Sequence, residues 1–150
     1  MINRRILVAV DGSDASINAS NYAIDMAKKL EASLTVLFIV ASARYIDFGY
    51  ATAGTMNEME SSKKKLAQEE VDKVSKKAME KGVTVKADVL INYFSVVKEI
   101  VEYAKYKMDL IITGSRGMTG FKKMLIGSVA SGVVTYAHCP VLVVKDASIY

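Results

Sequence analysis

The chain has 150 residues, of which 51% are hydrophobic and 24% charged, a balance typical of one soluble globular domain. No apolar run reaches the ~18 residues of a membrane helix, and the run at residues 6–10 is too short for a secretory signal, so we expect a cytoplasmic protein with no membrane partner. The net charge of +4 suits an anionic ligand, but the basic residues are not interleaved with aromatic ones, so we do not expect nucleic-acid binding.

Strand and helix patterns alternate along the chain. The strand patterns are short continuous apolar runs, typical of parallel strands buried on both faces. Ser13 or Asp14 can cap the first helix, Gly82 ends the second and Ser95 can cap the third. The predicted strands are 5–10, 34–40, 83–91, 109–113 and 141–144, and the predicted helices run to Leu30, over 56–81, to Ala104 and over 128–137, with a long loop at 41–55.

Each predicted helix has an apolar stripe at helical spacing, which we expect to face the core. The stripes are Ala19, Tyr22, Ala23, Met26, Ala27 and Leu30; Ala67, Val71, Val74 and Ala78; Val97, Ile100, Val101 and Ala104; and Ala130, Val133, Val134 and Ala137.

This βαβαβαβαβ order predicts a single domain over residues 1–150. Right-handed crossovers favour one doubly wound, Rossmann-like α/β sheet of five parallel strands, in the order 3-2-1-4-5, with helices on both faces. In such a sheet, ligands bind beyond the carboxyl ends of the strands, where the strand order reverses. Asp11 follows the first strand and a glycine-rich segment follows the fourth, so both are expected at one crevice.

The glycine-rich segment is GSRGMTGFKKMLIGS, from Gly114 to Ser128, and it holds four of the chain's nine glycines. Glycine lets a backbone turn tightly and approach a ligand, and the free N–H groups of a helix start attract anions. Ser128 can cap the helix and contact a phosphate, while Arg116, Lys122 and Lys123 add positive charge. The spacing is neither G-x4-GK[ST] nor G-x-G-x-x-G. A structural turn and a phosphate cradle both fit, and the position favours the cradle; for Asp11, likewise, a helix cap competes with a ligand role.

The G-x2-G-x9-G-S spacing resembles the nucleotide-binding motif of the universal stress protein family. The segments ILVAVDGS at 6–13, DLIITGS at 109–115 and CPVLVV at 139–144 extend the resemblance over nearly the whole chain. The resemblance implies an ATP-binding member, with ADP or AMP as alternatives and Mg²⁺ as a companion ion. It also implies a homodimer that pairs the last strands, Val141–Val144. The family often has Gly and then Pro after the third strand, where this chain has Asn92-Tyr-Phe-Ser95 beside the crevice.

The resemblance also assigns site residues. Asp11 would lie near the ribose and phosphates or a bound metal, and Ile39 would offer backbone groups to the adenine. Gly114 and Gly117 would flank the ribose and phosphates, and the helix start would hold the phosphates through backbone N–H groups and the Ser128 hydroxyl. The full predicted set is Asp11, Ile39, Thr113, Gly114, Arg116, Gly117, Gly127, Ser128 and Val129.

We expect a nucleotide-dependent switch or sensor in a stress response, with no catalytic residues and no metal-ligand cluster. Cys139 and His138 are the only Cys and His in the chain, and the crevice motifs have no water-positioning Glu or Gln and no phosphate-loop Lys. Two alternatives stay open. One is an adenine-nucleotide hydrolase or adenylyl transferase that uses the same crevice, although the His-x-x-His signature of many such transferases is missing. The other is a dimeric scaffold that binds no nucleotide.

Overall fold

The computed structural model describes residues 4–42, 53–117 and 126–145. These residues form alternating strands and helices, as predicted. The elements are β1 (Arg5–Val10), α1 (Asp14–Leu30), β2 (Ser33–Ala41), α2 (Ala53–Glu80), β3 (Val85–Asn92), α3 (Val96–Ala104), β4 (Leu110–Gly114), α4 (Ser128–Tyr136) and β5 (Val141–Val144).

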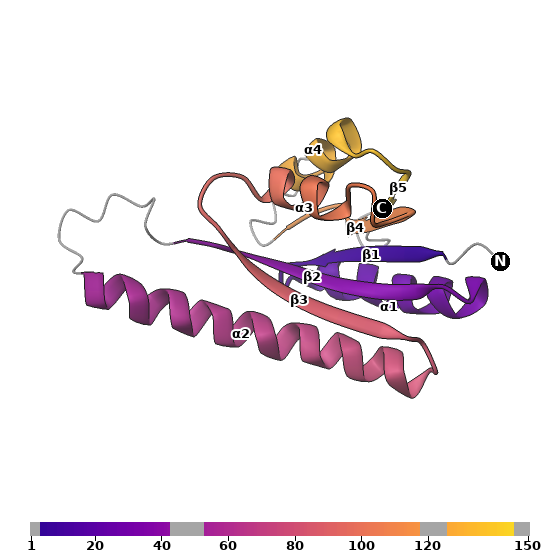
Figure 1. The fold of residues 1–150 in the computed structure, drawn as a ribbon, viewed down its shortest axis with the longest axis horizontal. Helices are drawn as coiled ribbons and strands as arrows, with labels where there is room; N and C mark the ends of the chain where they lie inside the picture. Colours follow the sequence, from indigo (N-terminus) through magenta and orange to yellow (C-terminus); the bar gives the residue numbers. More distant parts are fainter. Residues whose placement is uncertain (1–3, 43–52, 118–125, 146–150) are drawn as a thin grey trace.

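The strands form one parallel sheet in the order β3-β2-β1-β4-β5, which confirms the predicted fold class (Figure 1). Val8 of β1 lies opposite Val36 of β2 and Ile112 of β4, so the most apolar runs of the sequence form the middle of the sheet. The chain winds outward from β1 to β3 and then from β4 to β5 on the other side. The strand order therefore reverses between β1 and β4.

Helices cover both faces of the sheet. The side chains of β1 alternate between two cores, because successive residues of a strand point to opposite faces. Ile6 and Val8 pack with α1 and α2, whereas Leu7 packs with α3 and α4. Figure 1 shows α3 and α4 together on one side of the sheet and α2 on the other. Within the described residues, no helix is long and apolar enough to cross a bilayer.

Most helix ends agree with the sequence. The Ser13 hydroxyl caps α1 by accepting the Ser16 N–H at 3.2 Å, and the Ser95 hydroxyl caps α3 by accepting the Lys98 N–H at 3.3 Å. Gly82 follows α2 with a φ of +79°, a conformation that favours glycine. The predicted cap at Ser128 is wrong, because Gly127 is the N-cap of α4 and Ser128 is its first helical residue.

Three predicted core residues are exposed. The solvent-exposed fractions of Tyr22, Leu30 and Val134 are 47%, 38% and 52%. In α1 the buried face is built mainly from small residues, with Ile24 as its large buried side chain, and Tyr22 and Leu30 lie outside it. The predicted loop 41–55 also ends too late, since α2 begins at Ala53. The rest of that loop, 43–52, lies outside the described residues.

Candidate functional site

A cavity of about 440 Å³ lies at the carboxyl edge of the sheet, where the strand order reverses. Its walls come from the ends of β1, β2 and β4 and from the first turns of α1, α3 and α4. This volume is within the range of small-molecule sites, about 300–1,000 Å³. All nine predicted site residues line it: Asp11, Ile39, Thr113, Gly114, Arg116, Gly117, Gly127, Ser128 and Val129.

One part of the cavity wall is apolar. Leu37, Ile39 and Ala41 come from β2, and Val96 and Ile100 come from α3. Leu37, Ile39 and Ile100 also belong to the core on this face of the sheet, so neighbouring side chains hold them in place. This wall suits a flat apolar group of a ligand.

The opposite part of the cavity wall is the start of α4. The Gly127 N–H donates to the Ser115 carbonyl at 2.6 Å, and the first bond inside the helix runs from the Ser131 N–H to the Gly127 carbonyl at 3.0 Å. The N–H groups of Ser128, Val129 and Ala130 therefore have no acceptor within the helix. All three residues line the cavity. Free N–H groups and the positive end of the helix dipole make this wall suited to an anion.

Asp11 directly follows β1 and lies beside Gly117 of the glycine-rich segment. Its Oδ1 accepts the Ser13 N–H at 2.9 Å, and its own N–H donates to the Ser16 hydroxyl at 3.3 Å. Because Ser13 is the helix cap, the alternative in which Asp11 caps α1 is wrong. A Cβ added to Gly117 would lie 3.0 Å from Oδ2 of Asp11, so the carboxylate packs against the glycine loop. The two segments predicted to converge therefore lie in contact.

Gly114 has a structural reason to be glycine. A Cβ at this position would lie 2.9 Å from the Ala15 carbonyl oxygen, a distance that real Cβ atoms do not reach. Its missing side chain is therefore explained by the close approach of β4 to α1. Gly114 still lines the cavity, and its predicted contact with a ligand stays a prediction.

The cavity wall carries few ionisable groups. Among the described residues that line it, these are Asp11 and Arg116. The Thr113 side chain is buried in the wall. Lys122 and Lys123, which were expected to add charge, lie outside the described residues. In the described part of the chain, no three His, Cys, Asp or Glu residues are grouped so that they could hold a metal ion.

Two serines at the site were not predicted. Ser16 is buried, lines the cavity and donates its hydroxyl to the Ser13 carbonyl at 3.0 Å. Ser115 is buried beside the cavity and accepts the Gly127 N–H. Ser16 stands three residues after the helix cap, and Ser115 lies inside the glycine motif. These positions were the only sequence signals for either serine.

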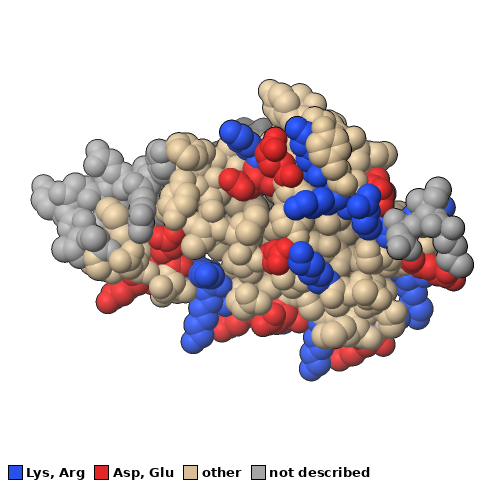
Figure 2. All heavy atoms as spheres, viewed as in Figure 1, with Lys and Arg blue, Asp and Glu red and all other residues tan. Residues whose placement is uncertain are grey.

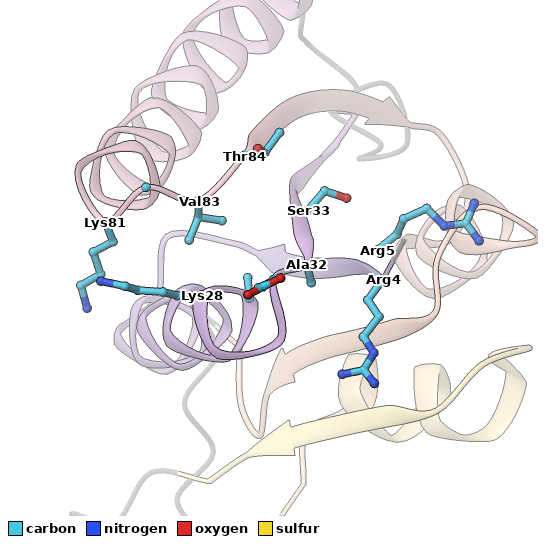
Figure 3. A pocket seen from close by; sticks show the side chains of 11 residues that line it. Arg4, Arg5, Lys28, Ala32, Ser33, Lys81, Val83 and Thr84 are labelled. Carbon is cyan, nitrogen blue, oxygen red and sulfur yellow. The ribbon is translucent and has the colours of Figure 1, made fainter. Parts of the chain in front are cut away.

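A second, larger hollow of about 580 Å³ lies at the amino edge of the sheet (Figure 3). Three of its four basic residues are explained without a ligand. Arg5 pairs with Asp109 at 3.0 Å and Lys81 with Asp25 at 2.6 Å. Lys28 lies in the last turn of α1, where a cation offsets the helix dipole. Figure 3 shows the Arg4 and Arg5 side chains directed away from the Lys28 and Lys81 side chains, so the four cations do not converge.

Charges of both signs share the face shown in Figure 2, where Lys and Arg alternate with Asp and Glu. On this face no single sign dominates a large area. The carboxyl-edge cavity is the candidate site, because it combines an apolar wall, a helix start and a carboxylate in one space.

The fold and the cavity define a doubly wound α/β protein with a cavity of small-molecule size at the switch point of its sheet. The model of the universal stress protein family matches residues 3–145, and the chain belongs to this family. A universal stress protein of Methanocaldococcus jannaschii is 38% identical over 143 residues, which cover 95% of this chain and 82% of that relative.

Solved structures of the family have the same fold. The universal stress protein UspA from Lactobacillus plantarum matches with a TM-score of 0.84 and 26% identity, covering 94% of this chain and 97% of that one. A universal stress protein from Archaeoglobus fulgidus in complex with dAMP matches with a TM-score of 0.66 and 21% identity, covering 97% and 100%. A family protein from Arabidopsis thaliana with AMP bound has a TM-score of 0.66 and 18% identity, covering 97% and 94%.

Proposed function

We propose that this protein binds an adenine nucleotide, ATP in the first place, and acts in the cytoplasm as a nucleotide-dependent switch or sensor of a stress response. The observation that carries the proposal is the single cavity that joins an apolar wall to the free N–H groups of α4. A nucleotide has the matching parts, a flat base and an anionic phosphate group. The dAMP and AMP complexes of the two structural neighbours support the choice of adenine.

The proposed arrangement follows the two walls. The base lies against the apolar wall, where the main chain of Ile39 is the candidate for polar contacts with the adenine. The phosphates lie at the start of α4, where the N–H groups of Ser128 and Val129 and the Ser128 hydroxyl are the donors, next to Gly127. Asp11 is the candidate acceptor for a ribose hydroxyl, or the candidate ligand for Mg²⁺ bound to the phosphates. Arg116 is the candidate source of positive charge.

We favour binding over rapid turnover. Asp11 and Arg116 are the ionisable side chains among the described cavity residues, and the Asp11 Oδ1 already accepts the Ser13 N–H. Hydrolysis of a phosphate needs a group that orients water as well as groups that stabilise charge. Prolonged incubation with ATP tests this preference. Several molecules of product formed per protein chain would favour the hydrolase or transferase alternative.

The nucleotide itself can be identified directly. Protein purified from cells is denatured, and any released small molecule is identified by mass. We expect ATP, ADP or AMP in a molar amount comparable with the protein. If no nucleotide is released and none raises the melting temperature of the folded protein, the scaffold alternative is favoured instead.

We also propose a homodimer formed by β5. The two edge strands of the sheet differ in charge: β3 carries Lys86 and Asp88, which pair at 3.2 Å, whereas β5 consists of four apolar residues. Charges on an edge strand oppose pairing with another chain. The Pro140 carbonyl accepts the Ile111 N–H of β4, and the Val144 carbonyl accepts the Ser115 N–H just beyond β4. Successive residues of a strand turn their main-chain polar groups to opposite sides. The N–H and carbonyl groups of Val141 and Val143 therefore point outward, away from β4. These groups can pair with a second β5 across a two-fold axis.

The dimer proposal is tested with two variants of Val143. Val143→Pro removes only the outward N–H group, which an edge strand tolerates, whereas Val143→Ala keeps it. Sedimentation equilibrium should show a dimer for the wild type and Val143→Ala and a monomer for Val143→Pro. Equal dimer affinities for the two variants would refute the β5 interface.

A further inference from the structure

Ser115 connects the candidate site with the edge strand through two main-chain hydrogen bonds. Its carbonyl accepts the Gly127 N–H at 2.6 Å, and its N–H donates to the Val144 carbonyl at 3.0 Å. Its side chain is 3% exposed, so the surrounding protein fixes its position. One residue therefore joins the N-cap of α4 to the last residue of β5.

On the cavity side, Ser115 is tied to the residues that start α4. Gly127 is the N-cap of this helix, and Ser128, Val129 and Ala130 line the cavity with N–H groups that have no acceptor within the helix. An anion bound to these groups holds the first turn of α4 and, with it, Gly127. The bond from Gly127 then holds the Ser115 peptide.

On the other side, Ser115 fixes the end of β5. This strand has four residues, and its contact with β4 begins with the bond from the Ile111 N–H to the Pro140 carbonyl and closes with the bond from Ser115 to Val144. Val143, whose polar groups face outward, comes directly before this last bond. Because Gly114 packs closely on Ala15 of α1, the end of β4 cannot easily follow a movement of β5. Loosening at Ser115 therefore frees the end of β5.

We propose that Ser115 is a positioning residue that couples nucleotide binding to dimer formation: an occupied site orders the β5 edge, and a paired β5 edge orders the start of α4. This inference rests on the proposed nucleotide site and on the β5 dimer. The coupling is reciprocal, and the dimer has two equal sites, so saturating ATP strengthens the dimer by the square of the factor by which dimer formation strengthens ATP binding at each site.

The first test uses the wild-type protein. Its dimer dissociation constant is measured by sedimentation with and without saturating ATP and Mg²⁺, and its ATP affinity is measured below and above the dimer dissociation constant. We expect the ATP affinity to rise at least about fivefold on dimer formation, and the dimer affinity to rise by about the square of that factor when both sites are filled. If ATP binds but the dimer constant stays the same, the coupling is refuted while the proposed function stands. If ATP does not bind, the proposed function itself fails, and a chain that stays monomeric at every concentration refutes the coupling.

The second test addresses the route through Ser115. Gly127 has a φ of −69°, which proline shares, so Gly127→Pro can keep the N-cap φ while it removes the N–H donor and its ring pushes the Ser115 carbonyl away. Gly127→Ala adds a Cβ but keeps the donor. Both constants are measured for each variant, and the coupling factor should fall to about one in Gly127→Pro but persist in Gly127→Ala. An equal coupling factor in the two variants would contradict the route.

A third measurement does not depend on either Gly127 variant. Amide hydrogen exchange of Ser115 is followed in the Val143→Pro protein, which we expect to be monomeric, before and after addition of ATP with Mg²⁺. ATP should slow the exchange of the Ser115 N–H at least about fivefold, because it strengthens the bond to Val144. Unchanged exchange in the presence of bound ATP would overturn the proposal.

Discussion

At the scale of single residues, the three glycines of the motif have different physical roles. Gly114 lets β4 pass close to Ala15, and Gly117 leaves room for the Asp11 carboxylate. A Cβ on Gly127 would make ordinary contacts, 3.4 Å from the Ser115 carbonyl oxygen and 3.5 Å from the Arg116 Cα. Of the three positions, Gly127 is therefore the one where the protein itself leaves room for a Cβ atom.

The Asp11 carboxylate gives a prediction at the same scale. Asp11→Asn keeps the acceptor for the Ser13 N–H but removes the negative charge from the cavity. We expect ATP affinity in Mg²⁺ to fall about tenfold, as for the loss of one hydrogen bond to a charged group. Asp14→Asn is the matched control, because Asp14 is exposed in the first turn of α1 and does not line the cavity. Equal titration curves for Asp11→Asn and the wild type would remove Asp11 from the site.

A second residue-scale prediction concerns Tyr103 of α3, whose hydroxyl donates to the Asp88 carboxylate of β3. This bond, followed by the bond from Lys86, lowers the pKa of Asp88 below its ordinary 3.8. A lowered carboxyl pKa stabilises the fold above the ordinary value, and this stabilisation is lost as the pH falls through the lowered pKa. Tyr103→Phe should lower the free energy of unfolding by about 1 kcal/mol at neutral pH.

The pH dependence checks the cause of that effect. Urea unfolding of the wild type and Tyr103→Phe is compared at neutral pH and over a series of decreasing acid pH values, through which Asp88 becomes protonated. The difference between the two proteins should shrink at acid pH. A difference that stays constant with pH would mean that packing of the ring, and not the bond to Asp88, accounts for it.

At the scale of elements, α3 and α4 pack so closely that one position must be glycine. A Cβ on Gly132 of α4 would lie 2.7 Å from Cγ2 of Val97 in α3. Both helices contribute to the cavity wall, since Val96 of α3 and Val129 of α4 line it. Their close contact therefore sets the distance between the apolar wall and the start of α4.

This contact can be tested by a double-mutant cycle. Gly132→Ala should lower the free energy of unfolding by about 1–2 kcal/mol, because overpacking outweighs the higher helix propensity of alanine. In a Val97→Ala background the same substitution should cost nothing or be stabilising, because the clashing methyl groups are gone. Chemical denaturation of the four proteins gives the coupling, and additive effects would refute the contact.

The elements also show how much could be predicted from the sequence. The strands and their order were predicted because β1, β2, β4 and β5 are continuous apolar runs joined by helical patterns, which leave few ways to form a sheet. Because that topology places two loops at one edge, the cavity residues followed from the fold and the family motif. Helix faces were less certain, and Tyr22 and Val134 were wrongly placed in the core, because apolar spacing does not say how wide the buried face is.

Hydrogen bonds between distant main-chain groups could not be predicted. Ser115 acts through its N–H and carbonyl groups, which every residue except proline has, so its side chain gives no signal. The cap at Gly127 was missed for a similar reason, because the neighbouring Ser128 is the better capping residue by type. Gly114 shows the opposite limit, since the sequence suggested a ligand contact and the structure gives a packing reason.

At the scale of the whole molecule, the two ends of the sheet differ in what their charged groups do. At the amino edge, carboxylates beside the hollow pair with Arg5 and Lys81. At the carboxyl edge, the described residues that line the cavity include one carboxylate and one guanidinium, and α4 begins there with N–H groups that have no acceptor within the helix. This arrangement beside an apolar wall is the one on which the proposed nucleotide site rests.

The measurement that tests this account most directly is a calorimetric titration of ATP with Mg²⁺ into the wild type, Gly127→Ala and Gly127→Val. The wild type should bind one ATP per chain. The branched side chain of Gly127→Val has to press against residues 115–117 or enter the cavity. The ATP affinity of this variant should therefore be at least about tenfold lower than that of the wild type, and the affinity of Gly127→Ala should lie between the two. Thermal unfolding shows that each protein is folded. A folded wild type that gives no binding heat, or a folded Gly127→Val that binds ATP as tightly as the wild type, would contradict the proposed site.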